Sequence, residues 1–265
     1  MFVLLFCWLL SVITYADDGV ELVKYRANNG AVVSVVRADA QAYQLALVSQ
    51  SDFSRRRLLD FLDDVPQAIA LINGGFFERS GRPNGFFKSG KWIVMSQKMR
   101  GVIGFGSLGV DDIMFDRLTV RDGQIVSRFT DDGWWHKKSF VLGGAPLMMR
   151  DGHRLDYDEE RLRPSFSRRR YARSAFCVHQ SGDLMFISVY GGDRHFYKAG
   201  MRMGLSLSEL QDFLVEIGCR NAINLDGGYS SSMVYDGRAI LGHWFQYVHE
   251  RPVSNALALI PRKSS

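Results

Sequence analysis

Short apolar runs separated by turn residues dominate the chain. The alternating or β-branched runs at residues 20–26 and 31–37 flank Asn28-Asn29-Gly30, which is typical of a β-hairpin. The same pattern predicts strands at 42–48, 68–72, 91–95, 101–105, 139–149 and 253–260, with hairpins over 117–129 and 174–190. Most of the chain is therefore expected to form short strands.

Only two segments carry apolar residues at helical spacing. One runs from Ser54 to Val65, behind a candidate cap at Ser51-Asp52, and the other runs from Ser206 to Gly218. The polar segment 156–170 is expected to be an exposed loop and a candidate lid. Because no linker rich in Pro, Gly and Ser divides the chain, we expect a single domain.

Both predicted helices lead into a buried strand that ends in a polar residue and two glycines. Asn73-Gly74-Gly75 aligns with Asp226-Gly227-Gly228, and Phe61 aligns with Phe213. This match predicts a pseudo-two-fold helix–strand–Gly-Gly repeat that would bring the two turns near each other. The alternative is that short helix–strand units resemble one another by chance.

The turn after Asp226 is the first candidate for chemistry. A carboxylate at a strand end, followed by glycines that can adopt positive φ, gathers a negative charge and several N–H donors in one place. We expect Asp226 to stay ionised and to take part in acid–base or nucleophilic chemistry. The alternative is that it only braces the turn. The segment from Gly227 to Ser231 could hold an anion, or it could be an ordinary Gly-Ser loop.

Other side chains offer groups for sugar or phosphate. Asn73 could hydrogen-bond sugar hydroxyls or serve as a turn residue, and Phe76 could stack on a sugar or fill the core. Arg173 follows the basic run 168–170 and enters an apolar strand, so its guanidinium would point inward and could pair with phosphate. Glu209 lies on the second predicted helix, where a surface carboxylate is the alternative.

The N-terminus resembles an export signal. An apolar run at residues 2–13 precedes small residues at Thr14 and Ala16, so we predict a cleaved signal peptide at 1–16 and an exported, periplasmic or secreted protein. An uncleaved anchor or a buried strand is the alternative. The run is too short to span a bilayer, and no other segment is long and apolar enough to cross a membrane. Of the remaining cysteines, Cys177 and Cys219 could form a disulfide or stay as buried thiols.

Charge and metal signatures are weak. The formal charge of +5 favours anionic ligands but does not argue for nucleic acid, and no nucleic-acid motif is visible. No Cys/His metal spacing occurs either. A divalent cation remains possible, because Asp226 and nearby carbonyls could hold one.

Five sequence blocks together resemble the phosphodiester glycosidase family. They are INGGFF, ARSAFCVHQSGDLMFISVYGG, GLSLSELQDFL, NAINLDGGYSSSMVYDG and RPVSNALAL, and they span about residues 65–260. The resemblance implies an α+β domain at 17–265, with mixed β-sheets flanked by helices, that cleaves the glycosidic bond to a phosphodiester. It implies a pocket of Asn73, Gly75, Arg173, Asp226, Gly227, Gly228, Ser230 and Ser231, with Glu209 and Arg251 at recurrent family positions. Gly74 and Phe76 are further candidate substrate contacts.

The chain departs from the family pattern at several positions. Tyr229 stands where the family usually has a third glycine, and Cys177 also replaces a glycine. The resemblance implies a mechanism in which Arg173 and the Gly-Ser donors hold phosphate, while Asp226 faces the anomeric carbon or its attacking water. The alternative hypothesis is a non-catalytic envelope module that binds an anionic glycan or a sugar-phosphate polymer.

Overall fold

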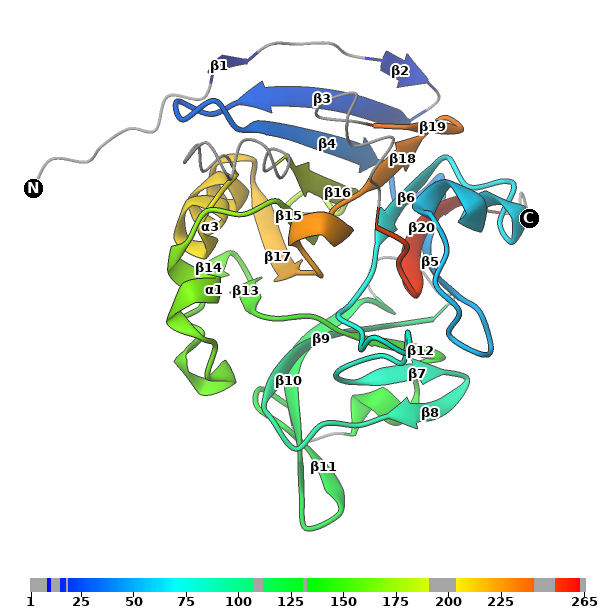
Figure 1. Cartoon of the computed structure of the whole chain (residues 1–265), viewed down its shortest axis with the longest axis vertical. Helices are drawn as coiled ribbons and strands as arrows, with labels where there is room; N and C mark the ends of the chain where they lie inside the picture. Colours follow the sequence, from blue (N-terminus) through cyan, green and yellow to red (C-terminus); the bar gives the residue numbers. More distant parts are fainter. Residues whose placement is uncertain are drawn as a thin grey trace, which may run out of the picture.

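Three β-sheets make up most of the structure, which is a computed structural model (Figure 1). It describes residues 19–106, 112–130, 133–190, 204–240 and 251–262, together with the backbone of 9–10 and 15–17. The second sheet lies at the lower end of the view in Figure 1, and strands β3 and β4 of the first sheet lie at the upper end.

The first sheet has nine strands. Its order is β1 (Leu9–Leu10), β3 (Val20–Arg26), β4 (Val32–Ala38), β16 (Leu184–Val189), β15 (Arg173–His179), β17 (Cys219–Asn224), β13 (Leu147–Arg150) and β14 (His153–Arg154), with β2 (Tyr15–Asp17) also paired to β3. The predicted hairpins over 20–37 and 174–190 are both present in this sheet.

The second sheet has six strands and the third has five. The second is ordered β11 (Gln124–Ser127), β10 (Met114–Arg121), β9 (Arg100–Phe105), β12 (Phe140–Gly143), β7 (Phe87–Ser89) and β8 (Lys91–Val94). The third is ordered β19 (Arg238–Ala239), β18 (Met233–Tyr235), β6 (Ala70–Asn73), β20 (Asn255–Pro261) and β5 (Tyr43–Ser49).

The expectation of mixed sheets was wrong for the described part of the chain, where every strand pairing is antiparallel. Neighbouring strands in a parallel pair need a long crossover, usually a helix. The chain has such a crossover in α3 (Leu207–Glu216), between β16 and β17. However, β15 lies between these two strands and pairs antiparallel with both, so the crossover creates no parallel neighbours.

Helix α3 forms where the sequence predicts it. Its N-cap is Ser206, whose side chain accepts a hydrogen bond from the N–H of Glu209, while Glu209 accepts one from the N–H of Ser206. This capping box satisfies two N–H groups that the first turn of a helix leaves open. The apolar face of α3 packs on the first sheet through Phe213 and Leu214.

The other predicted helix was wrong in extent and type. Instead of a helix over 54–65, the chain forms a 3-10 helix, η1 (Leu58–Asp63). The candidate cap Asp52 accepts a hydrogen bond from the N–H of Ser54, and Phe53 has a left-handed φ of 58°. A left-handed residue cannot continue into a right-handed helix, so η1 begins only after this turn.

The polar segment 156–170 is not simply an exposed loop. It contains η4 (Asp158–Glu160) and α1 (Pro164–Arg168), and Glu160 is fully buried. The Glu160 carboxylate accepts hydrogen bonds from the N–H groups of Gly101 and Leu147 and from the Arg117 guanidinium. The start of the segment is therefore fixed against the second sheet.

Two buried clusters occupy opposite faces of the first sheet. One joins it to the other two sheets, for example through Phe186, Ile103 and Ile72, and the second lies under α3. Cys177 and Cys219 form a disulfide in the second cluster, with Cα atoms 5.9 Å apart. The structure thus selects the disulfide from the two alternatives. None of the helices within the described residues has the length and apolar character needed to cross a membrane.

Candidate functional site

The two Gly-Gly turns lie against each other. Asn73 at the end of β6 donates from Nδ2 to the carbonyl oxygen of Asp226 at 2.7 Å, and the Asp226 N–H donates to the carbonyl oxygen of Gly74 at 3.1 Å. The expected proximity of the turns is confirmed. The strands that lead into them belong to different sheets, and the pseudo-two-fold symmetry itself stays a prediction.

The Asn73 amide is fully engaged with the protein. Besides Asp226, its Nδ2 donates to the carbonyl of Gly74 at 3.4 Å. Its Oδ1 accepts from the Ser174 hydroxyl at 2.6 Å and from the Ser232 N–H at 3.1 Å. Since a carboxamide has two donors and two acceptor sites, these bonds use its whole capacity. This geometry makes Asn73 a brace between the turns, and contact with a sugar stays a prediction.

Neighbouring oxygen atoms leave no room for a side chain at the first pair of glycines. A Cβ on Gly74 would lie 2.1 Å from Oδ1 of Asn255, and a Cβ on Gly75 would lie 2.3 Å from the carbonyl oxygen of Gly143. The Asn255 side chain also accepts a hydrogen bond from the Gly75 N–H at 2.8 Å. Sequence reasoning did not single out Asn255, although it lies in the RPVSNALAL block and follows a buried serine.

Four backbone N–H groups of the second turn already have acceptors within the protein. The Gly227 N–H donates to Oδ1 of Asp226 at 2.9 Å, and the Gly228 N–H donates to the carbonyl of Ala172 at 2.9 Å. The N–H groups of Ser230 and Ser231 donate to carbonyls within η5 (Gly228–Ser230) and its cap. These bonds occupy the N–H groups of Gly227, Gly228, Ser230 and Ser231, and anion binding by the turn stays a prediction.

The Asp226 carboxyl group titrates close to neutral pH. Burial raises its pKa from 3.8 to about 6, against the opposing effects of hydrogen bonds from the Ser230 side chain and the Gly227 N–H and of the charge on Arg251. At pH 7 about nine-tenths of such a group is ionised, and at pH 6 about half. The expectation that Asp226 stays ionised thus holds at pH 7 and above, and not at pH 6 or below.

Arg251 links the second turn to the NGGFF segment. Its Nη1 donates to the Ser230 hydroxyl at 3.2 Å, and its guanidinium lies 4.7 Å from the ring centre of Phe77. Ser230 is fully buried, whereas the neighbouring Tyr229 side chain is 55% exposed. Asp226, Ser230 and Arg251 form the Asp226 cluster, in which an acid, a hydroxyl group and a cation lie together.

Arg173 lies behind the turns and not in the Asp226 cluster. It points inward as expected, but only 1% of it is exposed. Its guanidinium donates to the carbonyls of Leu205, Phe166 and Arg169 and lies over the rings of Phe166 and Tyr171. These contacts do not support the predicted role of Arg173 in binding phosphate. They hold α1 against the first sheet.

Glu209 also has a structural environment. Besides capping α3, its carboxylate accepts hydrogen bonds from the Arg170 side chain. Burial alone would raise the pKa of Glu209, but the bonds from Arg170 and Ser206 outweigh it and hold the pKa below its usual value. Glu209 therefore positions the segment that leads into β15. The S-x-x-E signature of a capping box could have indicated this role from the sequence.

The remaining predicted residues border the turns. Phe76 is half-buried and packs edge-on against Phe166 of α1, with ring centres 6.0 Å apart. Ser231 is buried beside Ser230. Through the Phe76 contact, the segment 156–170 reaches the edge of the NGGFF turn.

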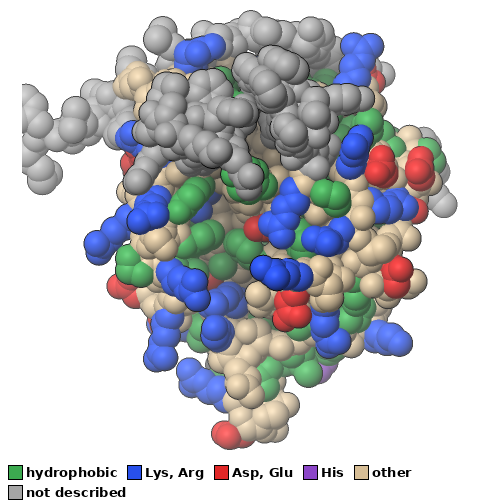
Figure 2. All heavy atoms as spheres, in the orientation of Figure 1, with side chains coloured by type: hydrophobic (Ala, Val, Ile, Leu, Met, Phe, Trp, Pro, Cys, Tyr) green, Lys and Arg blue, Asp and Glu red, His purple; other side chains and the backbone are tan. Residues whose placement is uncertain are grey.

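The surface charge of this face suits an anionic ligand. Figure 2 shows Lys and Arg side chains spread across the face seen in Figure 1, with fewer Asp and Glu side chains between them. Among the residues that the structure describes, no three His, Cys, Asp or Glu side chains gather into a group that could hold a metal ion.

These features define an antiparallel α+β domain with a near-neutral carboxyl group, a hydroxyl group and an arginine at a pair of Gly-Gly turns. The chain belongs to the phosphodiester glycosidase family, whose sequence profile matches residues 66–260. At the family level it is therefore related to hydrolases of the phosphodiester glycosidase type.

Solved structures share the fold at low sequence identity. A hypothetical protein from Synechocystis has a TM-score of 0.70 at 18% identity, over 92% of this chain and 62% of its own. The zebrafish N-acetylglucosamine-1-phosphodiester alpha-N-acetylglucosaminidase catalytic domain, auto-inhibited by its pro-peptide, has a TM-score of 0.64 at 16% identity, over 95% and 85%.

A third similar structure comes from Burkholderia pseudomallei and is described as a candidate exported protein. It has a TM-score of 0.59 at 14% identity, over 89% of this chain and 77% of its own. A search of curated proteins gave no match. The chain thus spans less than two thirds of the Synechocystis protein and most of the other two.

Proposed function

We propose that this protein hydrolyses the glycosidic bond of a sugar 1-phosphodiester. Water adds to the anomeric carbon, the bond from that carbon to the phosphate oxygen breaks, and the products are a free sugar and a phosphomonoester. The main observation that supports this proposal is the Asp226 carboxyl group, whose pKa is raised to about 6 and which lies beside Ser230 and Arg251. Family membership supports the same reaction class.

Asp226 acts as the base in this proposal. A phosphate ester is a good leaving group and takes the bonding electrons without prior protonation, so the reaction needs little acid catalysis. The attacking water must lose a proton, and a carboxylate with a pKa near the working pH accepts one efficiently. The same negative charge stabilises the positive charge that develops on the sugar ring.

Arg251 takes over the phosphate role that the sequence assigned to Arg173 and to the glycine N–H groups. One of its nitrogens holds Ser230, and the rest of its guanidinium fork matches the geometry of phosphate oxygens. Asn73, Arg173 and Glu209 are positioning residues in this scheme. They fix the turn, α1 and the segment before β15, respectively.

The exposed ring of Tyr229 is a candidate sugar contact. It follows Gly228 and precedes Ser230, and aromatic rings in such positions can stack on the apolar face of a sugar. We propose that the protein is exported, with residues 1–16 removed as a signal peptide. N-terminal sequencing of the protein after expression with its leader tests this: an N-terminus that still carries residues 1–16 would contradict removal.

The direct test is a hydrolysis assay with the 1-(methyl phosphate) diesters of several sugars, with and without chelator. We expect release of reducing sugar by the wild type and a loss of at least about a thousandfold in rate for Asp226→Asn, as for removal of a catalytic base and its charge. Circular dichroism confirms that the variant is folded. Full activity of Asp226→Asn would remove Asp226 from the mechanism. Binding of the esters without turnover by the wild type would instead establish the non-catalytic module.

A further inference from the structure

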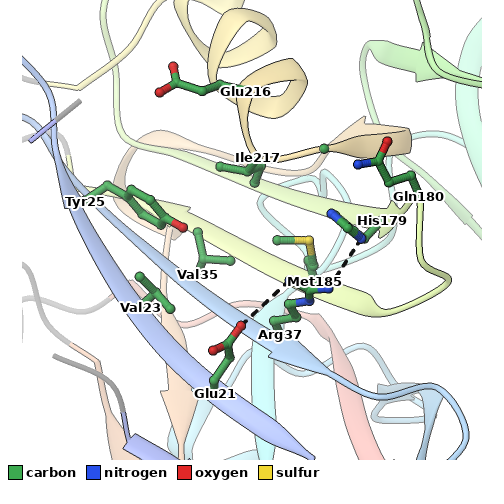
Figure 3. A pocket seen from close by; sticks show the side chains of 11 residues that line it. Glu21, Val23, Tyr25, Val35, Arg37, His179, Gln180, Met185, Glu216 and Ile217 are labelled. Carbon is green, nitrogen blue, oxygen red and sulfur yellow. Dashed lines mark hydrogen bonds and ion pairs between the residues drawn. The ribbon is translucent and has the colours of Figure 1, made fainter. Parts of the chain in front are cut away.

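A cavity lies on the first sheet, away from the Asp226 cluster. It has a volume of about 190 Å³ and opens beyond the C-terminal end of α3, where Ile217 and Gly218 form part of its wall (Figure 3). Strands β3 and β4 supply most of the rest. None of the residues that line it belongs to the two Gly-Gly turns.

The cavity combines an apolar floor with a polar rim. Val23, Val35 and Met185 are buried beneath it. At the rim, the Tyr25 hydroxyl points toward the middle of the ring of side chains in Figure 3, with Glu21 on β3 and Glu216 on α3 on either side. Within the described residues, the Tyr25 hydroxyl has no hydrogen-bond partner and Glu216 has no ion pair.

The one cationic side chain of this lining is already balanced. Arg37 donates from Nε to Oδ2 of Asp183 at 2.7 Å, and the Ser181 hydroxyl donates to the same oxygen at 2.8 Å. Glu21 forms a second, longer ion pair with the same guanidinium, 3.9 Å from Nη1 of Arg37. One guanidinium therefore faces the two carboxylates of Asp183 and Glu21, and Glu216 adds a third negative charge at the rim, so the net charge here is negative.

The electrostatic environment of the rim is negative. Burial raises the pKa of the Tyr25 hydroxyl, and the charges of Glu21 and Glu216 raise it further against the opposing charge of Arg37. Burial and Arg37 lower the pKa of His179, so its ring adds no positive charge at neutral pH. The C-terminal end of α3 contributes partial negative charge as well. This is a local acidic site in a chain with a net charge of +5.

We propose that this cavity binds an organic ammonium ion carried on a small body, such as the free amine of an amino sugar. The Tyr25 hydroxyl would accept a hydrogen bond from the ammonium group, the negative charges of Glu21 and Glu216 on either side would attract it, and the apolar floor would receive the carbon skeleton. The floor favours an organic cation over a metal ion, because hard metal ions need a shell of several oxygen ligands. This site goes beyond the proposed hydrolysis and does not depend on it.

Calorimetric titration tests the proposal with two probes of similar shape. We expect glucosamine to bind the wild type at least about tenfold more tightly than N-acetylglucosamine, which lacks the positive charge. The Glu21→Gln/Glu216→Gln variant should lose about tenfold or more in glucosamine affinity, and Tyr25→Phe should lose less. Nα-acetyl-lysine amide is a third probe, and tighter binding of it than of glucosamine would assign the ammonium group to a protein or peptide instead of a sugar.

Two control variants separate this cavity from the rest of the molecule. Asp60→Asn removes one exposed carboxylate from η1, and Asp226→Asn removes the carboxylate of the Asp226 cluster. Both should bind glucosamine as the wild type does. The proposal is overturned if neither amine binds, if the neutral sugar binds as well as glucosamine, or if the double variant keeps wild-type affinity. Loss of binding in Asp226→Asn alone would place the amine at the Asp226 cluster and also overturn it.

Discussion

Replacing Asp226 with asparagine should stabilise the protein at neutral pH while it abolishes activity. The native pKa of about 6 exceeds the ordinary value of 3.8, and this difference corresponds to about 3 kcal/mol of unfolding free energy. Between these two pH values the native state binds more protons at this position than the unfolded state does. Wild-type stability from this group is therefore present below pH 3.8 and is lost as pH rises through about 6.

The asparagine variant has no proton to lose. Its Oδ1 can still accept the hydrogen bond that the Gly227 N–H gives to Asp226, so the turn keeps its geometry. The unfolding free energy of the variant minus that of the wild type should be up to about 3 kcal/mol higher above pH 7 than below pH 4. The attraction between the ionised carboxylate and Arg251 is already contained in this value, because it is one of the effects that set the pKa of Asp226.

Urea denaturation at a series of pH values measures this effect. Five tryptophans provide a fluorescence signal, and subtracting the wild-type curve from the variant curve cancels the titration of all other groups. Wild-type activity, measured in parallel, should fall as pH drops through about 6, because the base becomes protonated. A stability difference that stays constant from pH 3.5 to 8 would refute the raised pKa of the Asp226 carboxyl group.

Three further outcomes follow from single contacts. Arg251→Ala should weaken binding of a sugar 1-phosphodiester by about tenfold or more. It should also move the midpoint of the pH–rate profile upward, because the charge of Arg251 lowers the pKa of Asp226, whereas Arg251→Lys should keep the midpoint. Unchanged binding and an unchanged midpoint in Arg251→Ala would contradict this. Gly75→Ala should lower the free energy of unfolding in denaturant by about 1–3 kcal/mol, because its Cβ would lie 2.3 Å from a carbonyl oxygen on β12. An unfolding midpoint equal to that of the wild type would show that the turn can move aside. Reducing the Cys177–Cys219 disulfide, which spans 42 residues, should cost about 4 kcal/mol by the loop-entropy relation; equal urea midpoints with and without reductant would oppose it.

Local sequence signals predicted most of the strands. The run at 20–26 forms β3 with those bounds, and the turn at Asp122-Gly123 joins β10 to β11. Side-chain alternation and turn residues act over a few positions, so they can be read without tertiary information. The same holds for α3, whose cap lies within its own first turn. At η1 the local pattern misled, because the left-handed Phe53 packs its carbonyl oxygen so closely on Gly81 that a Cβ there would lie 2.0 Å from it.

Long-range partners were harder to infer. The approach of Asn73 to Asp226 could be expected because the two turns share a sequence pattern, but the sequence does not say which side chain faces which. Glu160 lies in a highly charged run, which is typical of the surface. It is buried because Arg117 and two N–H groups, 13 to 59 positions away, satisfy its carboxylate.

The same limit decides the chemistry of the site. A sequence shows that a Gly-Gly-Tyr-Ser-Ser turn has N–H donors, but not that the Asp226 side chain and the carbonyl of Ala172 already accept from them. An N–H group that is used in this way is not free to hold a phosphate, and for this reason the proposed function assigns the phosphate to the Arg251 side chain beside the turn. The bonds from Gly227 and Ser230 stabilise the ionised form of Asp226 less than burial destabilises it. In the proposed reaction the turn therefore serves to hold a carboxylate near its titration point, and the phosphate is expected beside the turn, at Arg251.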